Sequence, residues 1–415
     1  MRRIPLGALQ ERQFRLFFSG QLVSLLGDAI GPFALTWAVL DLTNSATDLG
    51  LVQFAKVVPM VGFLLAGGVY ADRLPRRAVM LTADVTRMCS QGTIAALLLT
   101  HHAQIWELAV LQAISGCATG FFNPAATGLT PMLVSAQHLQ EANGLRGISQ
   151  AATGLIGPTI AGLLVVGVGS GYALAIDAAS FAVSAWFLGR LSLPAHVPIA
   201  AQSFVNDLRD GWREFTARSW VVILVVTASL GNFLGGIWQV LGAAYTKHHG
   251  GPLAWTVILV GLSVGGLIGG AVTLRARPQY PLRVAMGSLI PWFLPPLLFG
   301  LGAPFYVVAL GCLVASVGLM VSNTVWETTM QQRIPSASLS RVAAYDWFGS
   351  MLCQPVGLAI AGPLAIAFGM RATFLAVAAV SIVLFTTSSL MPPIRGLRRL
   401  DEPALEQVAQ QLVAD

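Results

Sequence analysis

Charged residues are scarce in this chain of 415 residues, since Asp, Glu, Lys and Arg together make up 10% of it, against roughly 25% in an ordinary soluble domain. Hydrophobic residues make up 55%. So few charges cannot cover a surface that meets water on all sides, so the composition excludes a soluble globular fold. Stretches of about 20 apolar residues, enough to cross a hydrocarbon core of ~30 Å, follow one another instead.

Residue patterns that carry chemistry are also missing. The four cysteines lie inside apolar runs, where a thiol behaves as a small hydrophobic group, so neither disulfides nor a metal site is expected. The adjacent histidines at 101–102 and 248–249 have no carboxylate or cysteine beside them to complete a ligand set. No phosphate-binding loop of the G-x-x-x-x-G-K-[ST] type occurs, which disfavours ATP-driven pumping. We expect no enzyme, no cofactor and no metal, and the net charge of +6 indicates membrane topology rather than nucleic-acid binding.

The apolar runs predict an all-α integral membrane protein with twelve transmembrane helices in two pseudo-symmetric bundles of six. The expected spans are 14–40, 50–71, 78–100, 104–127, 144–167, 170–190, 219–246, 252–275, 282–302, 303–327, 342–367 and 371–392. The expected organisation is a first bundle over 1–190, a cytoplasmic linker over 191–218, a second bundle over 219–392 and a cytoplasmic tail over 393–415. The basic N-terminus precedes an apolar run too long for a signal peptide, so it predicts a retained first span.

Arginine is distributed unevenly among the expected loops. With both termini in the cytoplasm, the outer loops hold only Lys247 and Arg371, and nearly all other basic residues lie inside. The excess of positive charge on cytoplasmic loops therefore predicts this orientation. The expected location is the plasma or inner membrane of a bacterial cell.

One loop concentrates charge, in the stretch GGVYADRLPRRAVM between the second and third spans. A similar stretch, GGAVTLRARPQYPLRVAM, occurs at residues 269–286. There Gly270 and Arg275 correspond to Gly68 and Arg73, but Leu274 stands in place of Asp72. The tripeptide IAG at 160–162 likewise recurs at 360–362. These repeats indicate two homologous halves with a site between them.

This loop, together with the six-plus-six division, resembles the signature of the major facilitator superfamily. The phrases FRLFFSGQLVSLLGDAIGPFALTW, ADVTRM, EANGL and DLRDGW resemble its macrolide-efflux and siderophore-exporter branch. The resemblance implies that Asp72 latches an inner gate by approaching the start of the eleventh span near Arg341, where the helix dipole favours an anion. The alternative is a loop that only anchors topology. The expected gate residues are Gly67, Gly68, Asp72, Arg73, Arg76 and Arg77.

The fifth span, GLIGPTIAG, resembles the glycine pattern of exporters in this superfamily. Small residues let helices approach closely, and Pro158 removes a backbone donor and bends the helix. Ordinary close packing and a specific antiporter role both remain open for Gly154, Gly157, Pro158 and Gly162. The fourth span, LAVLQAISGCATGFF, lacks the arginine of related drug–proton antiporters, so their coupling scheme does not transfer.

Ionisable residues inside the spans are the candidates for proton coupling, because charge in the membrane is costly and usually faces a cavity or a partner. Asp28 and Lys56 lie at similar depths, which predicts a neutralising pair that is either structural or proton-carrying. Asp177 either joins or replaces Asp28, or bonds to small neighbours. Asp84 and Arg87 are three residues apart and should pair along one helix face. Inner-gate candidates are Arg146, Glu327 and Asp346.

The resemblance implies a central cavity lined by spans 1, 4, 7 and 10. Large aromatic and amide side chains there suit a bulky, amphipathic ligand, although packing within the bundle is the alternative. The cavity candidates are Gln21, Trp37, Gln112, Asn123, Asn232, Trp238, Gln239, Asn323 and Trp326.

The sequence favours a monomeric secondary transporter that exports a hydrophobic drug, antibiotic or metabolite by proton-coupled alternating access. Its expected partners are a small-molecule substrate, protons and the lipid bilayer, with no nucleic acid. Uptake or facilitated diffusion of a small nutrient is one alternative, and a membrane sensor without transport is another.

Overall fold

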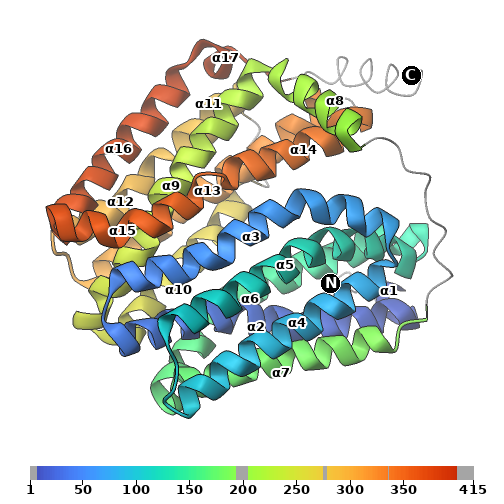
Figure 1. Cartoon of the computed structure of the whole chain (residues 1–415). Coiled ribbons are helices and arrows are strands. Elements are labelled where there is room, and N and C mark those ends of the chain that lie inside the picture. Colours follow the sequence, from blue (N-terminus) through green and yellow to red (C-terminus); the bar gives the residue numbers. More distant parts are fainter. Residues whose placement is uncertain (1–6, 193–203, 274–277, 335, 400–415) are drawn as a thin grey trace, which may run out of the picture. The chain divides into compact units, whose positions relative to one another are not determined.

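The computed structural model describes residues 7–192, 204–273, 278–334 and 336–399, and within these ranges every regular element is a helix and no strand occurs (Figure 1). For some residues only the backbone is described, and residues 64–73 are the longest such stretch in the first bundle. The prediction of an all-α membrane protein is confirmed, because ten helical segments are long and apolar enough to cross a membrane.

The ten segments are α2 (Arg12–Thr43), α5 (Ile105–Leu133), α6 (Leu139–Val168), α7 (Ser170–Gly189), α9 (Ser219–His248), α10 (Gly251–Thr273), Pro281–Gly300, α13 (Phe305–Arg333), Val342–Phe368 and α16 (Met370–Leu390). The other two expected spans form α3 (Ala46–Arg73) and α4 (Arg76–Leu99), which are not among the ten. Four charged residues make α4 less apolar than its neighbours. The number of twelve spans therefore stays a prediction.

Two of the ten segments are interrupted by prolines. Pro281–Gly300 consists of α11 (Pro281–Ser288), the 3₁₀ turn η2 (Ile290–Phe293) and α12 (Leu294–Gly300). Val342–Phe368 joins α14 (Ser336–Met351) to α15 (Gln354–Phe368). A proline cannot donate a backbone hydrogen bond, so each helix restarts with proline in its first turn.

The shorter elements are α1 (Gly7–Gln10), η1 (Ala136–His138), α8 (Phe204–Thr216) and α17 (Pro392–Arg395). The linker helix α8 packs on α14, where Phe215 is buried and its ring centroid lies 5.8 Å from that of Tyr345. Trp212 lies 5.7 Å from the same ring and is exposed. The amphipathic sequence of the linker thus forms a helix that is docked on one neighbour.

The chain divides into two compact units, Met1–Ala200 with Ala243–Thr256, and Ala201–Gly242 with Val257–Asp415. In the first unit, α3 lies along α5, both α2 and α4 lie along α7, and α6 lies along α2 (Figure 1). In the second unit, α11 lies along α13, and α12 lies along α16. The end of α9 and the start of α10 therefore belong to the first unit, although the sequence assigns both helices to the second bundle.

Candidate functional site

A buried arginine of the first unit, Arg87, contacts aromatic rings and carboxylates from several helices. Arg87 on α4 is buried, and its guanidinium carbon lies 4.2 Å from the ring centroid of Phe122 and 4.3 Å from that of Phe181. A guanidinium stacks well on aromatic faces, and here α5 and α7 supply one ring each. The cation is thus clamped by two aromatic rings that come from different helices.

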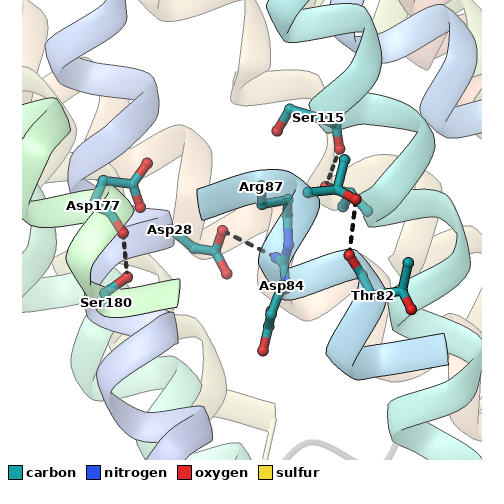
Figure 2. A network of polar contacts seen from close by, with 9 residues as sticks. Asp28, Thr82, Asp84, Arg87, Ser115, Asp177 and Ser180 are labelled. Carbon is teal, nitrogen blue, oxygen red and sulfur yellow. Dashed lines mark hydrogen bonds and ion pairs between the residues drawn. The ribbon is translucent and has the colours of Figure 1, made fainter. Parts of the chain in front are cut away.

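Two carboxylates share the edge of this guanidinium (Figure 2). Nη2 donates a hydrogen bond to Oδ1 of Asp84, whose side chain is fully buried, so the predicted Asp84–Arg87 pair is confirmed. Nη1 lies 3.7 Å from Oδ1 of Asp28 on α2, whose side chain is 46% exposed. The expected ion pair of Asp28 with Lys56 is wrong for these described residues, because equal depth does not fix how two helices are rotated about their axes.

Asp177 lies on α7 against a groove of small residues on α2. A Cβ atom on Gly27 or Gly31 would overlap its carboxyl group, and Asp177 is 1% exposed. The hydroxyl of Ser180 donates to the backbone carbonyl of Asp177 at 2.7 Å (Figure 2), whereas Oδ1 of Asp177 has no hydrogen-bond partner in the described part of the chain. A buried carboxyl without such a partner is costly, so Asp177 remains a functional candidate.

These residues form one electrostatic cluster. Asp177 interacts electrostatically with Asp28, with Lys56 and with Arg87, and Asp28 also interacts with Asp84. With every group ionised, three carboxylates face two basic groups, so the coupling cluster, as we call these five residues, has a net charge of −1. A proton or one other positive charge would neutralise it.

The arginines that begin α4 brace it to two other helices. Nη1 of Arg76 donates to the backbone carbonyl of Gly128 on α5. Nε of Arg77 donates to the carbonyl of Leu188 at 2.9 Å, and Nη2 donates to that of Gly189. Arg77 therefore caps the carboxyl end of α7, where the helix dipole favours a cation.

The other parts of the expected gate lie outside the described side chains. Gly67, Gly68, Asp72 and Arg73 belong to the part of α3 of which only the backbone is described. Arg341 and the counterpart residues Leu274 and Arg275 also fall outside the described side chains. The latch stays a prediction.

The glycine pattern of α6 makes two close contacts. A Cβ on Gly157 would overlap Ala29 of α2, and a Cβ on Gly162 would overlap Thr256 at the start of α10. At Gly154 a Cβ would meet no atom within 4 Å. Pro158 continues the helix between the two contacts. Close approach thus explains two of the three glycines by packing alone.

An ion pair that the sequence did not indicate lies at the far end of α2. Lys247, in the last turn of α9, donates to the backbone carbonyl of Leu40, and its Nζ lies 3.5 Å from Oδ1 of Asp41. Both partners belong to the last turns of α2, whose free carbonyls attract a cation. Residues 41 and 247 are 206 positions apart in the sequence, so no local pattern predicts this pair.

A second unexpected contact joins the start of α2 to the segment before α6. Glu11 accepts hydrogen bonds from Nδ1 of His138 at 2.8 Å and from the backbone amide and hydroxyl of Ser135. These bonds, above all that from His138, lower the pKa of the Glu11 carboxyl below its usual value.

The cavity candidates differ in exposure. Gln21, Trp37, Gln112, Trp238 and Trp326 are buried, Asn232 is half-buried, and Asn123, Gln239 and Asn323 are exposed. Several bond within their own unit: Gln112 donates to Gln91 at 3.2 Å, Asn232 to the carbonyl of Ser350 at 2.9 Å, and Trp326 to Asp346 at 3.1 Å. Of the remaining gate candidates, Arg146 donates to Thr130 at 2.8 Å and Glu327 is exposed.

A pocket of about 550 Å³ lies between α4 and α5. It is lined by Leu74, Pro75, Ala78, Val79, Thr82, Ala83, Thr86, Ile114, Cys117, Ala118 and Phe121. Its lining is almost wholly apolar and includes no member of the coupling cluster. Sequence reasoning missed it, because its residues read as ordinary span residues.

The family model described as "Transmembrane secretion effector" matches residues 4–289, which is most of the chain. The chain belongs to this family of the major facilitator superfamily. The predicted resemblance is therefore confirmed, and this major facilitator protein is a multi-pass membrane transporter.

Curated relatives align with this transporter over nearly their whole length. The multidrug efflux pump Tap of Mycolicibacterium fortuitum is 27% identical over 414 residues, which covers 94% of this chain and 98% of Tap. Macrolide efflux protein A of Streptococcus pyogenes is 22% identical over 399 residues, and this alignment covers 94% of this chain and 97% of the macrolide efflux protein.

Solved structures share the fold. A mutant of the nucleoside transporter NupG superposes with a TM-score of 0.72 at 15% identity, covering 90% of this chain and 98% of NupG. A bacterial homologue of the iron transporter ferroportin, in an inward-facing state, gives a TM-score of 0.69 at 16% identity, covering 92% and 99%. These structural likenesses show that the fold is shared, and they give no information about the substrate.

Proposed function

We propose that this transporter exports a bulky, hydrophobic compound in exchange for protons, by alternating access of a central site. The two curated relatives, one a multidrug and one a macrolide efflux protein, support export of such compounds. The observation that supports proton coupling is the charge of the coupling cluster. Its three carboxylates outnumber its two basic groups, so one carboxylate has no basic partner within the cluster.

Within this cluster, Asp28 is the carboxylate best suited to exchange a proton. Its side chain is 46% exposed, whereas Asp84 is fully buried and hydrogen-bonded to Arg87. Asp177 is buried against α2 and is screened from water. A group that exchanges a proton cannot be enclosed by protein on all sides, so the exposure of its side chain favours Asp28 among the three carboxylates.

The test uses proteoliposomes that contain the purified protein and a fluorescent amphipathic dye. An imposed pH gradient should drive the dye across the membrane, and Asp28→Asn should lower this flux at least tenfold, since one protonation site carries the coupling. The matched control is Asp48→Asn, which also removes an acid from a helix of the first unit, but in the first turn of α3 and outside the five residues of the coupling cluster.

The outcomes separate the candidate functions. Full proton-driven flux in Asp28→Asn would refute the assignment of the proton to Asp28. Flux that follows only the gradient of the dye, or of a small nutrient, would establish facilitated diffusion. Binding of ligands without any flux would establish a sensor.

A further inference from the structure

A groove in the first unit plays no part in the proposed transport cycle. It is the pocket of about 550 Å³ between α4 and α5, a volume in the usual range for sites of small molecules. Helix α4 supplies Thr82 to its lining, and α5 supplies Ala118 and Phe121. Leu74 and Ile114, which also line it, are exposed, so the groove is open on one side.

The lining favours hydrocarbon over water. None of the lining residues that the structure describes is charged. The hydroxyl of Thr86 donates to the backbone carbonyl of Thr82 at 2.8 Å, so it is already satisfied within α4. Cys117 adds a thiol, which behaves as a small hydrophobic group. Water molecules need several polar partners, and the described lining offers few, so hydrocarbon is the better match.

The groove is about as long as one leaflet of a bilayer is deep. It begins at Pro75, the N-cap of α4, and continues along this helix to Thr86. These two residues are 11 positions apart, which corresponds to ~17 Å at a rise of 1.5 Å per residue. Half of a hydrocarbon core of ~30 Å is ~15 Å. An acyl chain that enters at the membrane surface and ends near the midplane fits this length.

A positive charge lies at the start of the groove. Arg76 is one turn from Val79 and two turns from Ala83, which both line the groove, so it shares their face of α4. Its Nη1 donates to the backbone carbonyl of Gly128, so it spans the two helices that form the groove. Arg77 instead donates to the end of α7. Arginine is costly inside hydrocarbon, so this start of α4 belongs at a membrane surface, where lipid headgroups lie.

We propose that this groove binds one acyl chain of an anionic phospholipid, with the headgroup at Arg76 and the chain along α4 as far as Thr86. The proposal does not depend on which compound is transported. The charge of one arginine near the membrane surface should favour an anionic over a zwitterionic headgroup about fivefold. A bound lipid would also brace α4 against α5, the helices that supply Arg87 and Phe122 of the aromatic clamp.

The experiment follows the modification of Cys117 by N-phenylmaleimide in the purified full-length protein, in detergent to which lipid is added. Cys117 lies in the groove, so a bound chain should shield it. Cys89 on α4 is the matched control, because it is exposed and is not among the lining residues. Two variants, each with the other three cysteines replaced by alanine, report the two thiols separately.

The two lipids to compare are phosphatidylglycerol and phosphatidylcholine with the same acyl chains. Half-maximal protection of Cys117 should need about fivefold less phosphatidylglycerol than phosphatidylcholine. Protection of Cys89 should not differ between the lipids.

Substitutions separate the charge from the groove. Arg76→Gln should abolish the difference between the two lipids, whereas Arg77→Gln, which removes the same charge on the side of α7, should keep it. Because Arg76 also binds Gly128, a variant that leaves Arg76 in place is needed. Thr82→Trp places an indole in the groove at an exposed position, so it should slow the modification of Cys117 without lipid and remove the effect of added lipid.

Equal protection of Cys117 by the two lipids, or an equal loss of preference in Arg76→Gln and Arg77→Gln, would overturn the proposal. Protection by the amphipathic dye but not by lipid would also overturn it and would assign the groove to the transported compound. A Thr82→Trp protein in which lipid still protects Cys117 would show that the chain binds elsewhere.

Discussion

Replacing Gly31 by alanine tests whether α2 and α7 pack around the carboxyl group of Asp177. The new Cβ would overlap this carboxyl, which is 1% exposed and lies in the face that α7 presents to α2. Alanine in place of glycine favours a helix by about 1 kcal/mol. Overpacking costs about 1–3 kcal/mol, and displacing a buried polar group costs a further 1–3 kcal/mol or so. We therefore expect a net loss of about 1–5 kcal/mol in the free energy of unfolding.

The measurement is thermal unfolding of the purified protein in detergent, followed by intrinsic fluorescence. Gly92→Ala on α4 is the matched control, because its Cβ would face Ala178, the neighbour of Asp177 on the same helix α7, at an ordinary 3.8 Å. The control should unfold at the parental temperature or slightly above it. If Gly31→Ala unfolds at the same temperature as Gly92→Ala, the helices have room to move apart and the packing argument is refuted.

Two further contacts give predictions. Because bonding to His138 lowers the pKa of Glu11, the stability from this contact is complete above the usual carboxyl pKa of about 4.5 and is lost as the pH falls through the lowered value. Glu11→Gln should thus lower the unfolding temperature at neutral pH, and the difference from the parent should vanish in acid. Lys247→Gln removes the ion pair with Asp41, so the end of α9 should detach from α2 more often. A cysteine introduced at the buried Thr246 reports this detachment. In detergent it should react with a maleimide about fivefold faster in the double variant Thr246→Cys/Lys247→Gln than in Thr246→Cys alone. Equal rates would show that the pair does not hold the end of α9.

Hydropathy was enough to predict the helices, because the length of an apolar run is fixed by the thickness of the membrane. The starts of α5 and α7, for example, lie within a residue of the expected spans. The interruptions inside Pro281–Gly300 and Val342–Phe368 were missed, since prolines in membrane helices are common and only tertiary contacts decide which of them breaks a helix.

The candidate site was predictable in its members but not in its pairing. Asp84 and Arg87 are three residues apart on one helix, so their contact follows from helical geometry. The partner of Asp28 depends on how helices are rotated and on how far the arginine side chain reaches, and a single sequence contains neither quantity. The aromatic clamp was missed for the same reason, since Phe122 and Phe181 read as ordinary apolar residues of separate spans.

Arg77 has a consequence for the order of synthesis. It reaches Leu188, which follows it by 111 residues, so its acceptor does not yet exist when the guanidinium leaves the ribosome. At about 5–20 residues per second, the carbonyls at the end of α7 follow roughly 6–22 s later. During that interval Arg76 can already hold α4 to Gly128 of α5, whereas Arg77 has no acceptor on α7. The contacts of α4 with α5 can therefore form before its contact with the end of α7, and a chain that stops before residue 188 lacks the second contact.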